Sequence, residues 1–245
     1  MKRFALMLVL IVTTCSLMAQ NNYVPPTKPY KVLVSFFAGP ALEWVQPKTV
    51  GYDLVAPSLG FRAGVPIEIN LTERENFYFT TGIHVKFEHS SLTLPEKYEL
   101  LAGTPSVIVN TNRKYSNFYL SIPTGIKMKV AISPKSMLGL NLGLYHSLFL
   151  SGKTYDEFNL SNISTTDYSI TTNLVDNKYG AMFKESGFGG IGYEYKINPN
   201  LRAYVYANYV LTFTNFFAPN SMNSVNLQKE SAISQGVELL VGIGL

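Results

Sequence analysis

The chain is poor in cysteine, in charge and in long apolar runs, and each shortage argues against one class of protein. Cys15 is the only cysteine among the 245 residues and lies close to the N-terminus. Charged residues make up 15% of the chain, whereas about 25% is usual for a soluble domain. The unbroken apolar run Phe4–Val12 is too short for a membrane-spanning helix, which needs roughly 20 residues. A disulfide framework, an ordinary soluble domain and a helical membrane protein are therefore all disfavoured.

The N-terminus has the pattern of a secretory signal peptide, in which basic residues precede a short apolar run and a small residue precedes the cleavage site. Here Lys2 and Arg3 precede the apolar run, and Ala19 is the small residue. We therefore expect a signal peptide over residues 1–19 that is cleaved after Ala19. Cleavage would remove Cys15, so the exported chain could form no disulfide, no thiolate metal site and no cysteine nucleophile.

The charge of the chain is close to balance, whereas its aromatic content is high. The 20 Lys and Arg residues exceed the 16 Asp and Glu residues by four, and the excess falls to two without Lys2 and Arg3 (18 − 16 = 2). Because nucleic-acid binding needs a strongly basic surface, we expect no nucleic-acid partner. Low charge together with 16 Tyr and 15 Phe favours a membrane protein built of strands.

Alternation with a period of two residues supports the strands. In the clearest case, Leu138, Leu140, Leu142 and Leu144 alternate with Gly139, Asn141, Gly143 and Tyr145. Similar alternation runs through residues 59–69, 77–88 and 236–245, and no charge falls on the apolar face of these segments. Such a pattern predicts strands with one apolar face.

The complete pattern predicts eight strands, at residues 31–44, 54–70, 76–91, 115–131, 137–152, 181–197, 201–217 and 234–245. Short links alternate with long ones, as they do in outer-membrane barrels, where tight periplasmic turns alternate with longer extracellular loops. We therefore predict an all-β fold, an eight-stranded antiparallel transmembrane up-and-down β-barrel over residues 31–245 with both termini in the periplasm. Residues 20–30, with three prolines, would form a short periplasmic segment before it.

The non-apolar face of these strands favours a narrow lumen over the wet surface of a soluble barrel or sandwich. It is mainly Gly, Ser, Asn and Tyr with a sparse set of charges of both signs, and charges inside a barrel must pair. The alternation points the following charged or titratable residues inward: Arg62, Glu68, His84, Lys86, Glu88, Lys127, Lys129, Glu194, Lys196, Arg202 and Glu238. Our hypothesis is a lumen filled by a salt-bridge network, with no continuous water channel.

One segment resembles a known family. Asn117–Lys127 contains Tyr119-Leu120-Ser121-Ile122-Pro123, which is similar to the "Y-L-x-I-P" strand of small outer-membrane barrels of Bacteroidetes-type bacteria. These proteins are grouped as outer-membrane β-barrel domain or PorT-like proteins and share the architecture of the OmpA and OmpX barrels. The resemblance implies a cell outer membrane location and a non-enzymatic structural or interaction role, including a PorT-like part in a secretion or envelope-assembly complex. Many barrels end in phenylalanine, whereas this chain ends in Leu245.

Two alternative functions remain open: a lipid-modifying enzyme, or a small transporter or porin if the lumen opens. His89-Ser90-Ser91, with Glu96 or Glu99 as an orienting acid, resembles the histidine, serine and glutamate arrangement of lipid A deacylases. The ordinary interpretation of these residues is a hydrated strand end. The histidines His84, His89 and His146 do not pair at a metal-ligand spacing.

These observations assign no catalytic, cofactor-binding or metal-binding residue, no cofactor and no enzymatic activity. The expected partners are outer-membrane lipid and lipopolysaccharide around a monomeric barrel. Protein partners would bind through the predicted extracellular loops 92–114, 153–180 and 218–233, because loops are where binding functions concentrate.

Overall fold

The structure is a computed structural model that describes residues 32–72, 76–98, 106–158, 168–172, 181–218, 222, 225 and 227–245. The predicted signal peptide and the proline-rich segment 20–30 lie outside the described residues. No helix in the described part of the chain is long and apolar enough to cross a membrane.

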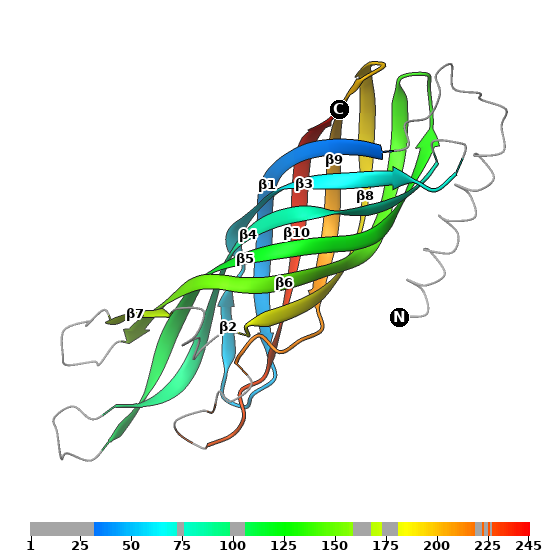
Figure 1. The fold of residues 1–245 in the computed structure, drawn as a ribbon. Helices are drawn as coiled ribbons and strands as arrows, with labels where there is room; N and C mark the ends of the chain where they lie inside the picture. Colours follow the sequence, from blue (N-terminus) through cyan, green and yellow to red (C-terminus); the bar gives the residue numbers. More distant parts are fainter. Residues whose placement is uncertain are drawn as a thin grey trace.

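Eight long antiparallel strands of the described chain form a closed barrel, which confirms the predicted fold (Figure 1). They are β1 (Val32–Pro47), β3 (Ser58–Asn70), β4 (Phe77–Tyr98), β5 (Val107–Ala131), β6 (Ser136–Phe158), β8 (Phe183–Asn198), β9 (Leu201–Thr212) and β10 (Ala232–Gly244). Each pairs with the next in chain order, and β1 pairs with β10 to close the sheet. Closure leaves no unpaired edge in the wall, as a membrane requires.

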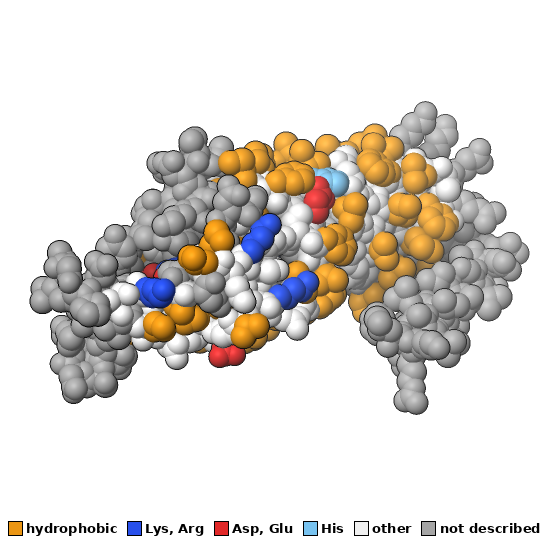
Figure 2. Space-filling view, turned by 90° about the horizontal axis from the view of Figure 1, so that it is seen from below, with side chains coloured by type: hydrophobic (Ala, Val, Ile, Leu, Met, Phe, Trp, Pro, Cys, Tyr) orange, Lys and Arg blue, Asp and Glu red, His pale blue; other side chains and the backbone are white. Residues whose placement is uncertain are grey.

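The alternation in the sequence becomes an alternation between the outer wall and the lumen. In β1 every second residue from Leu33 to Val45 is buried, and the residues between them are largely exposed. In β6 Leu138, Leu142 and Leu144 are exposed on the wall, whereas Tyr145 is buried inside. Figure 2 shows the result on one face, where apolar side chains cover much of the barrel and charged ones are few. An apolar outside with a polar inside is the arrangement that lipid favours.

The two ends of the barrel differ. The strands β3, β5 and β8 end at the same end of the barrel as the C-terminus, which we call the inner end, and β4, β6 and β9 begin there (Figure 1). We call the opposite end the outer end. Side chains of the short turns hold the backbone, since the Asn200 amide donates to Asn198 Oδ1 at 2.9 Å and the Ser136 amide donates to Ser133 Oγ at 3.0 Å. These are the local turns that Asn and Ser favour.

At the outer end, the predicted loops 92–114 and 153–180 were partly wrong, because strands extend into both ranges. The strands β4 and β5 stay paired up to Tyr98 and Val107, and β6 continues to Phe158. Two short strands, β2 (Asp53–Ala56) and β7 (Tyr168–Thr172), pair with β4 and β6 there. With 22, 25 and 23 residues, β4, β5 and β6 far exceed the roughly 9–11 residues that cross a bilayer. The lengths of these strands place their outer parts beyond the bilayer, and Figure 1 shows them projecting at the outer end.

Prolines and a close backbone contact shape the wall. Pro40, Pro66 and Pro123 each lie where pairing with one neighbouring strand is interrupted, because proline has no amide to donate. Beside the first of these, Gly39 packs against β10 so tightly that a Cβ there would lie 1.8 Å from the carbonyl oxygen of Leu239. Only a residue without a side chain allows this approach.

We expect Gly39→Val to destabilise the barrel by about 3 kcal/mol or more, since the added carbon atoms would force β1 and β10 apart. The fraction of protein that migrates as a folded barrel on an unheated detergent gel measures the effect. Gly189→Val is the matched control, because a Cβ at Gly189 meets nothing within 4 Å. Equal folded fractions for the two variants would contradict the importance of this contact.

Candidate functional site: the charged lumen

The lumen near the inner end contains a cluster of two carboxylates and two lysines. Lys129 Nζ donates to Glu68 Oε2 at 2.6 Å and to Glu194 Oε2 at 2.8 Å, and Lys127 also pairs with Glu68. The hydroxyl of Tyr206 donates to the other oxygen of Glu194 at 2.7 Å. The four charges come from β3, β5 and β8, so the cluster ties together strands from opposite parts of the wall.

A second charged cluster lies toward the outer end. Lys184 Nζ of β8 donates to both oxygens of Glu88 of β4, at 2.7 and 2.9 Å. Lys86 Nζ lies 3.0 Å from Glu88 Oε2 and pairs also with Glu43 of β1. All four side chains are buried. Since a buried charge is costly unless it is paired, each cluster requires all of its members.

Between the clusters, Arg62 spans the lumen. Its Nε donates to Glu238 Oε1 at 2.8 Å, and its guanidinium lies 4.0 Å from the ring centroid of Tyr145. The ion pairs of these three regions join five cations to five anions, so the charges of these ten residues cancel: Arg62, Lys86, Lys127, Lys129 and Lys184 against Glu43, Glu68, Glu88, Glu194 and Glu238.

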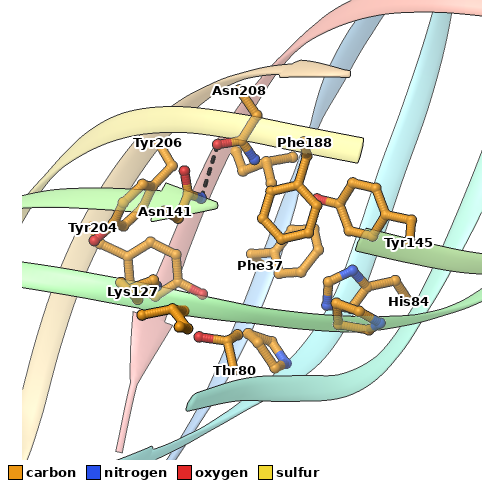
Figure 3. A pocket seen from close by; sticks show the side chains of 14 residues that line it. Phe37, Thr80, His84, Lys127, Asn141, Tyr145, Phe188, Tyr204, Tyr206 and Asn208 are labelled. Carbon is orange, nitrogen blue, oxygen red and sulfur yellow. Dashed lines mark hydrogen bonds between the residues drawn. The ribbon is translucent and has the colours of Figure 1, made fainter. Parts of the chain in front are cut away.

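A small cavity of about 40 Å³ is lined by side chains that include His84, Lys127 and Tyr145. Figure 3 shows that aromatic rings surround it, including the stacked pair Tyr145 and Phe188, whose ring centroids are 4.3 Å apart. Both ring nitrogens of His84 and the hydroxyl of Thr80 are buried without a hydrogen-bond partner among the described residues. A cavity of this size has room for about two or three water molecules, which is far less than a continuous channel needs.

Apolar side chains fill the outer end of the lumen. We call this cluster the aromatic plug, and its members are Val45, Tyr52, Leu92, Leu94, Tyr115, Phe216, Phe217 and Ala232. Phe216 and Phe217 follow the end of β9 and turn inward, so the predicted continuation of that strand to residue 217 was wrong. The Phe216 amide donates to the Ala232 carbonyl at 2.8 Å, and its ring meets Tyr115 edge to face at 5.1 Å. The plug therefore closes the barrel above the charged clusters.

Beyond the plug, an ion pair braces the extended sheet. Arg113 of β5 donates to both oxygens of Asp156 on β6, each at 2.6 Å, and lies 3.0 Å from Glu96 of β4. Burial alone would lower the pKa of Arg113, but hydrogen bonding to Asp156 and the nearby acidic charges raise it above its usual value. The cation is thus held at every accessible pH, and it joins the three longest strands outside the membrane.

The predicted lumen residues are placed almost entirely as the alternation indicated. Ten of them are buried in the barrel: Arg62, Glu68, His84, Lys86, Glu88, Lys127, Lys129, Glu194, Arg202 and Glu238. Lys196 is only half-buried near an inner turn. Sequence reasoning missed Glu43 and Lys184, although both share the inward parity of their strands, and Glu230, whose carboxylate accepts a hydrogen bond from Tyr52.

Of the two acids in the arrangement that resembles lipid A deacylases, the structure rules out Glu96. His89 is exposed and Ser91 half-buried on the outer face of β4, whereas Glu96 lies on the opposite face and pairs with Arg113. The second acid, Glu99, lies outside the described residues. The described residues also contain no group of three His, Cys, Asp or Glu side chains that could hold a metal ion.

A closed antiparallel barrel with an apolar wall and paired charges inside is a transmembrane β-barrel. The chain belongs to the outer membrane protein beta-barrel domain family, whose model matches residues 18–218. It is thus an outer-membrane protein, and the predicted membership of an outer-membrane β-barrel domain family is confirmed.

Solved structures that are similar to this chain include Neisserial surface protein A, with 11% identity, a TM-score of 0.45 and coverage of 88% of this chain and 97% of that chain. The outer membrane protease OmpT of Escherichia coli has 10% identity, a TM-score of 0.39 and coverage of 93% and 98%. OprG of Pseudomonas aeruginosa has 8% identity, a TM-score of 0.41 and coverage of 91% and 98%. No curated protein matches the sequence.

Removing one member of a lumen cluster should destabilise the barrel strongly. We expect Lys129→Met to cost about 3–5 kcal/mol, because Glu68 and Glu194 would both lose a buried partner. Urea unfolding of the barrel in phospholipid vesicles measures the change. The matched control is Lys114→Met, which breaks the exposed pair with Glu157 and should cost less than about 1 kcal/mol. A loss for Lys129→Met no larger than that of the control would contradict a stabilising network.

Proposed function

We propose that this outer-membrane protein is a closed barrel that acts through its surface and conducts nothing through its lumen. The single observation that supports this proposal is the filling of the lumen by balanced ion pairs below the aromatic plug. An ion that entered would have to break buried pairs and displace packed aromatic rings. The cost of separating buried charges makes that unfavourable. This supports a structural or interaction role over the transporter or porin alternative.

The outer end supports an interaction role. The extended parts of β4, β5 and β6 form a braced sheet outside the bilayer, and exposed apolar side chains such as Ile108 and Tyr155 lie on it. We propose that a protein partner binds here, through residues 92–114, 153–180 and 218–233. Such a partner would suit a PorT-like part in a secretion or envelope-assembly complex. Membrane lipid and lipopolysaccharide would surround the monomeric barrel.

The closed lumen is tested by electrical recording. The purified full-length protein, folded and inserted into a planar lipid bilayer, should produce no stable conductance steps, because ion pairs and the aromatic plug fill the described part of the lumen. Stable, reproducible steps would overturn the proposal and favour a small porin.

The interaction surface is tested in cells by cross-linking followed by mass spectrometry of the tagged protein. Deletion of residues 159–176, between the outer part of β6 and β8, should remove cross-linked protein partners while the barrel still folds on an unheated gel. The control is the triple change Ser133→Gly, Pro134→Asn and Lys135→Gly in a turn at the inner end, which should keep the partners. Unchanged cross-links after the outer deletion would contradict binding at this surface.

A further inference from the structure

Three polar side chains meet on the outer wall, away from the lumen. Thr124 of β5, His146 of β6 and Glu185 of β8 lie on three neighbouring strands. The Thr124 hydroxyl lies 2.8 Å from His146 Nε2, and His146 Nδ1 lies 2.9 Å from Glu185 Oε1 and 2.8 Å from Oε2. A histidine and an acidic side chain also meet within the apolar part of the face in Figure 2.

The surroundings of this polar group are lipid-facing. Ile122 and Ile126 flank Thr124 along the outside of β5, and Leu144 and Leu148 flank His146 along β6, all of them exposed on the wall. Ionisable side chains are rare on such a surface because lipid cannot solvate them. The His146 and Glu185 side chains keep 35% and 29% of their exposed area, so molecules beside the wall can reach them. A polar group in this position is expensive, which favours a functional reason for it.

The order of the hydrogen bonds is that of an activated nucleophile. A hydroxyl faces one nitrogen of an imidazole, and a carboxylate faces the other. With Nδ1 protonated and donating to Glu185, Nε2 is free to accept the proton of the threonine hydroxyl. This is the relation of nucleophile, general base and orienting acid in serine hydrolases, which recurs on unrelated folds.

The wall beside the group leaves room for a lipid chain. Below Glu185 on the outer face of β8, the next two outward positions are Gly187 and Gly189, and a Cβ at Gly189 would meet nothing within 4 Å. Phe213 covers Gly187 from the side, with its ring 2.7 Å from where a Cβ would be. The open backbone at Gly189, beside the Phe213 ring, can contact an extended acyl chain through apolar surface.

The backbone near Thr124 is also unusual. The pairing of β4 with β5 is interrupted between the pairs Thr80↔Gly125 and His84↔Ser121. Residues 81–83 and 122–124 therefore form no pairs with each other. Pro123 lies within this interruption, and the missing pairs follow from its lack of an amide hydrogen.

We infer from these features that Thr124, His146 and Glu185 form an acyl-transfer site for the ester-linked acyl chain of a membrane lipid. Thr124 Oγ1 attacks the ester carbonyl carbon while His146 Nε2 takes the hydroxyl proton. The C–O bond of the ester then breaks, and the departing lipid alcohol takes that proton from His146. Water then attacks the acyl-threonine carbonyl carbon while His146 Nε2 takes its proton, the bond from that carbon to Thr124 Oγ1 breaks, and His146 gives the proton to Oγ1, which releases the fatty acid and restores Thr124. This inference goes beyond the proposed function and does not depend on whether the lumen conducts.

The site is tested with the folded full-length protein in mixed micelles of dioleoylphosphatidylethanolamine. We expect release of oleate, and a mass increase of one oleoyl group on the peptide that contains Thr124 early in the reaction. Thr124→Val and His146→Gln should each lower the rate by about 100-fold or more, since each removes the nucleophile or its base. Thr124→Ser should keep the activity.

The matched control is His89→Gln, which changes another exposed histidine on the outer wall and should leave the rate unchanged. Folding of every variant is checked by migration on an unheated gel. Release of oleate at the same rate by Thr124→Val would overturn the inference, as would a wild-type protein that releases no oleate and carries no oleoyl group. Neither result would affect the conductance test of the closed lumen.

Discussion

The requirement that buried charges pair is the constraint on which the rest of this barrel depends. A membrane wall must close on itself so that every backbone group is paired, and eight strands enclose an interior that side chains just fill. Inside that space Lys129 can remain charged only because Glu68 and Glu194 lie within 2.8 Å of it. Each such contact joins strands that are distant in the sequence, so the network fixes the cross-section of the barrel as well as its polarity.

The two ends of the barrel differ from this charged central part and from each other. At the inner end, short turns can link adjacent strands directly, since nothing beyond the membrane has to be built there. At the outer end, Phe216 and Phe217 leave the wall and pack into the lumen, which replaces paired charges by apolar contact. Above them the sheet is no longer a barrel in lipid, and the ion pair of Arg113 with Asp156 braces it in water. The closed lumen and the projecting sheet both support our proposal that the protein acts through its surface.

The sequence predicted the wall well, because alternation is imposed by lipid on one side and the lumen on the other. Parity alone placed Arg62 and Glu238 inside, although their contact joins residues far apart in the chain. Parity could not show where strands end. The loop predicted at 92–114 is largely a continuation of β4 and β5. Leu92 and Leu94 alternate with polar residues there as in a strand, and they belong to the aromatic plug.

The polar group on the outer wall could not be predicted from the sequence, for a different reason. Thr124, His146 and Glu185 are far apart in the sequence, and only the register between β5, β6 and β8 brings them together. The short motif around His89 and Ser91 matched a known pattern in sequence, yet Glu96 points to the other side of the sheet. In a β-barrel, function on the wall depends on neighbours across strands, and local spacing is a poor guide to it.

The claim that the lumen is closed is tested most directly by the reactivity of a single cysteine inside it. Ser121 is fully buried in the lumen wall, with its hydroxyl 2.8 Å from that of Ser147. In the folded protein, Ser121→Cys should not react with a small charged thiol reagent, whereas Ser151→Cys on the exposed outer side of β6 should react rapidly. Rapid labelling of the cysteine at position 121 in the folded barrel would show that water and ions reach the lumen, and would contradict the account.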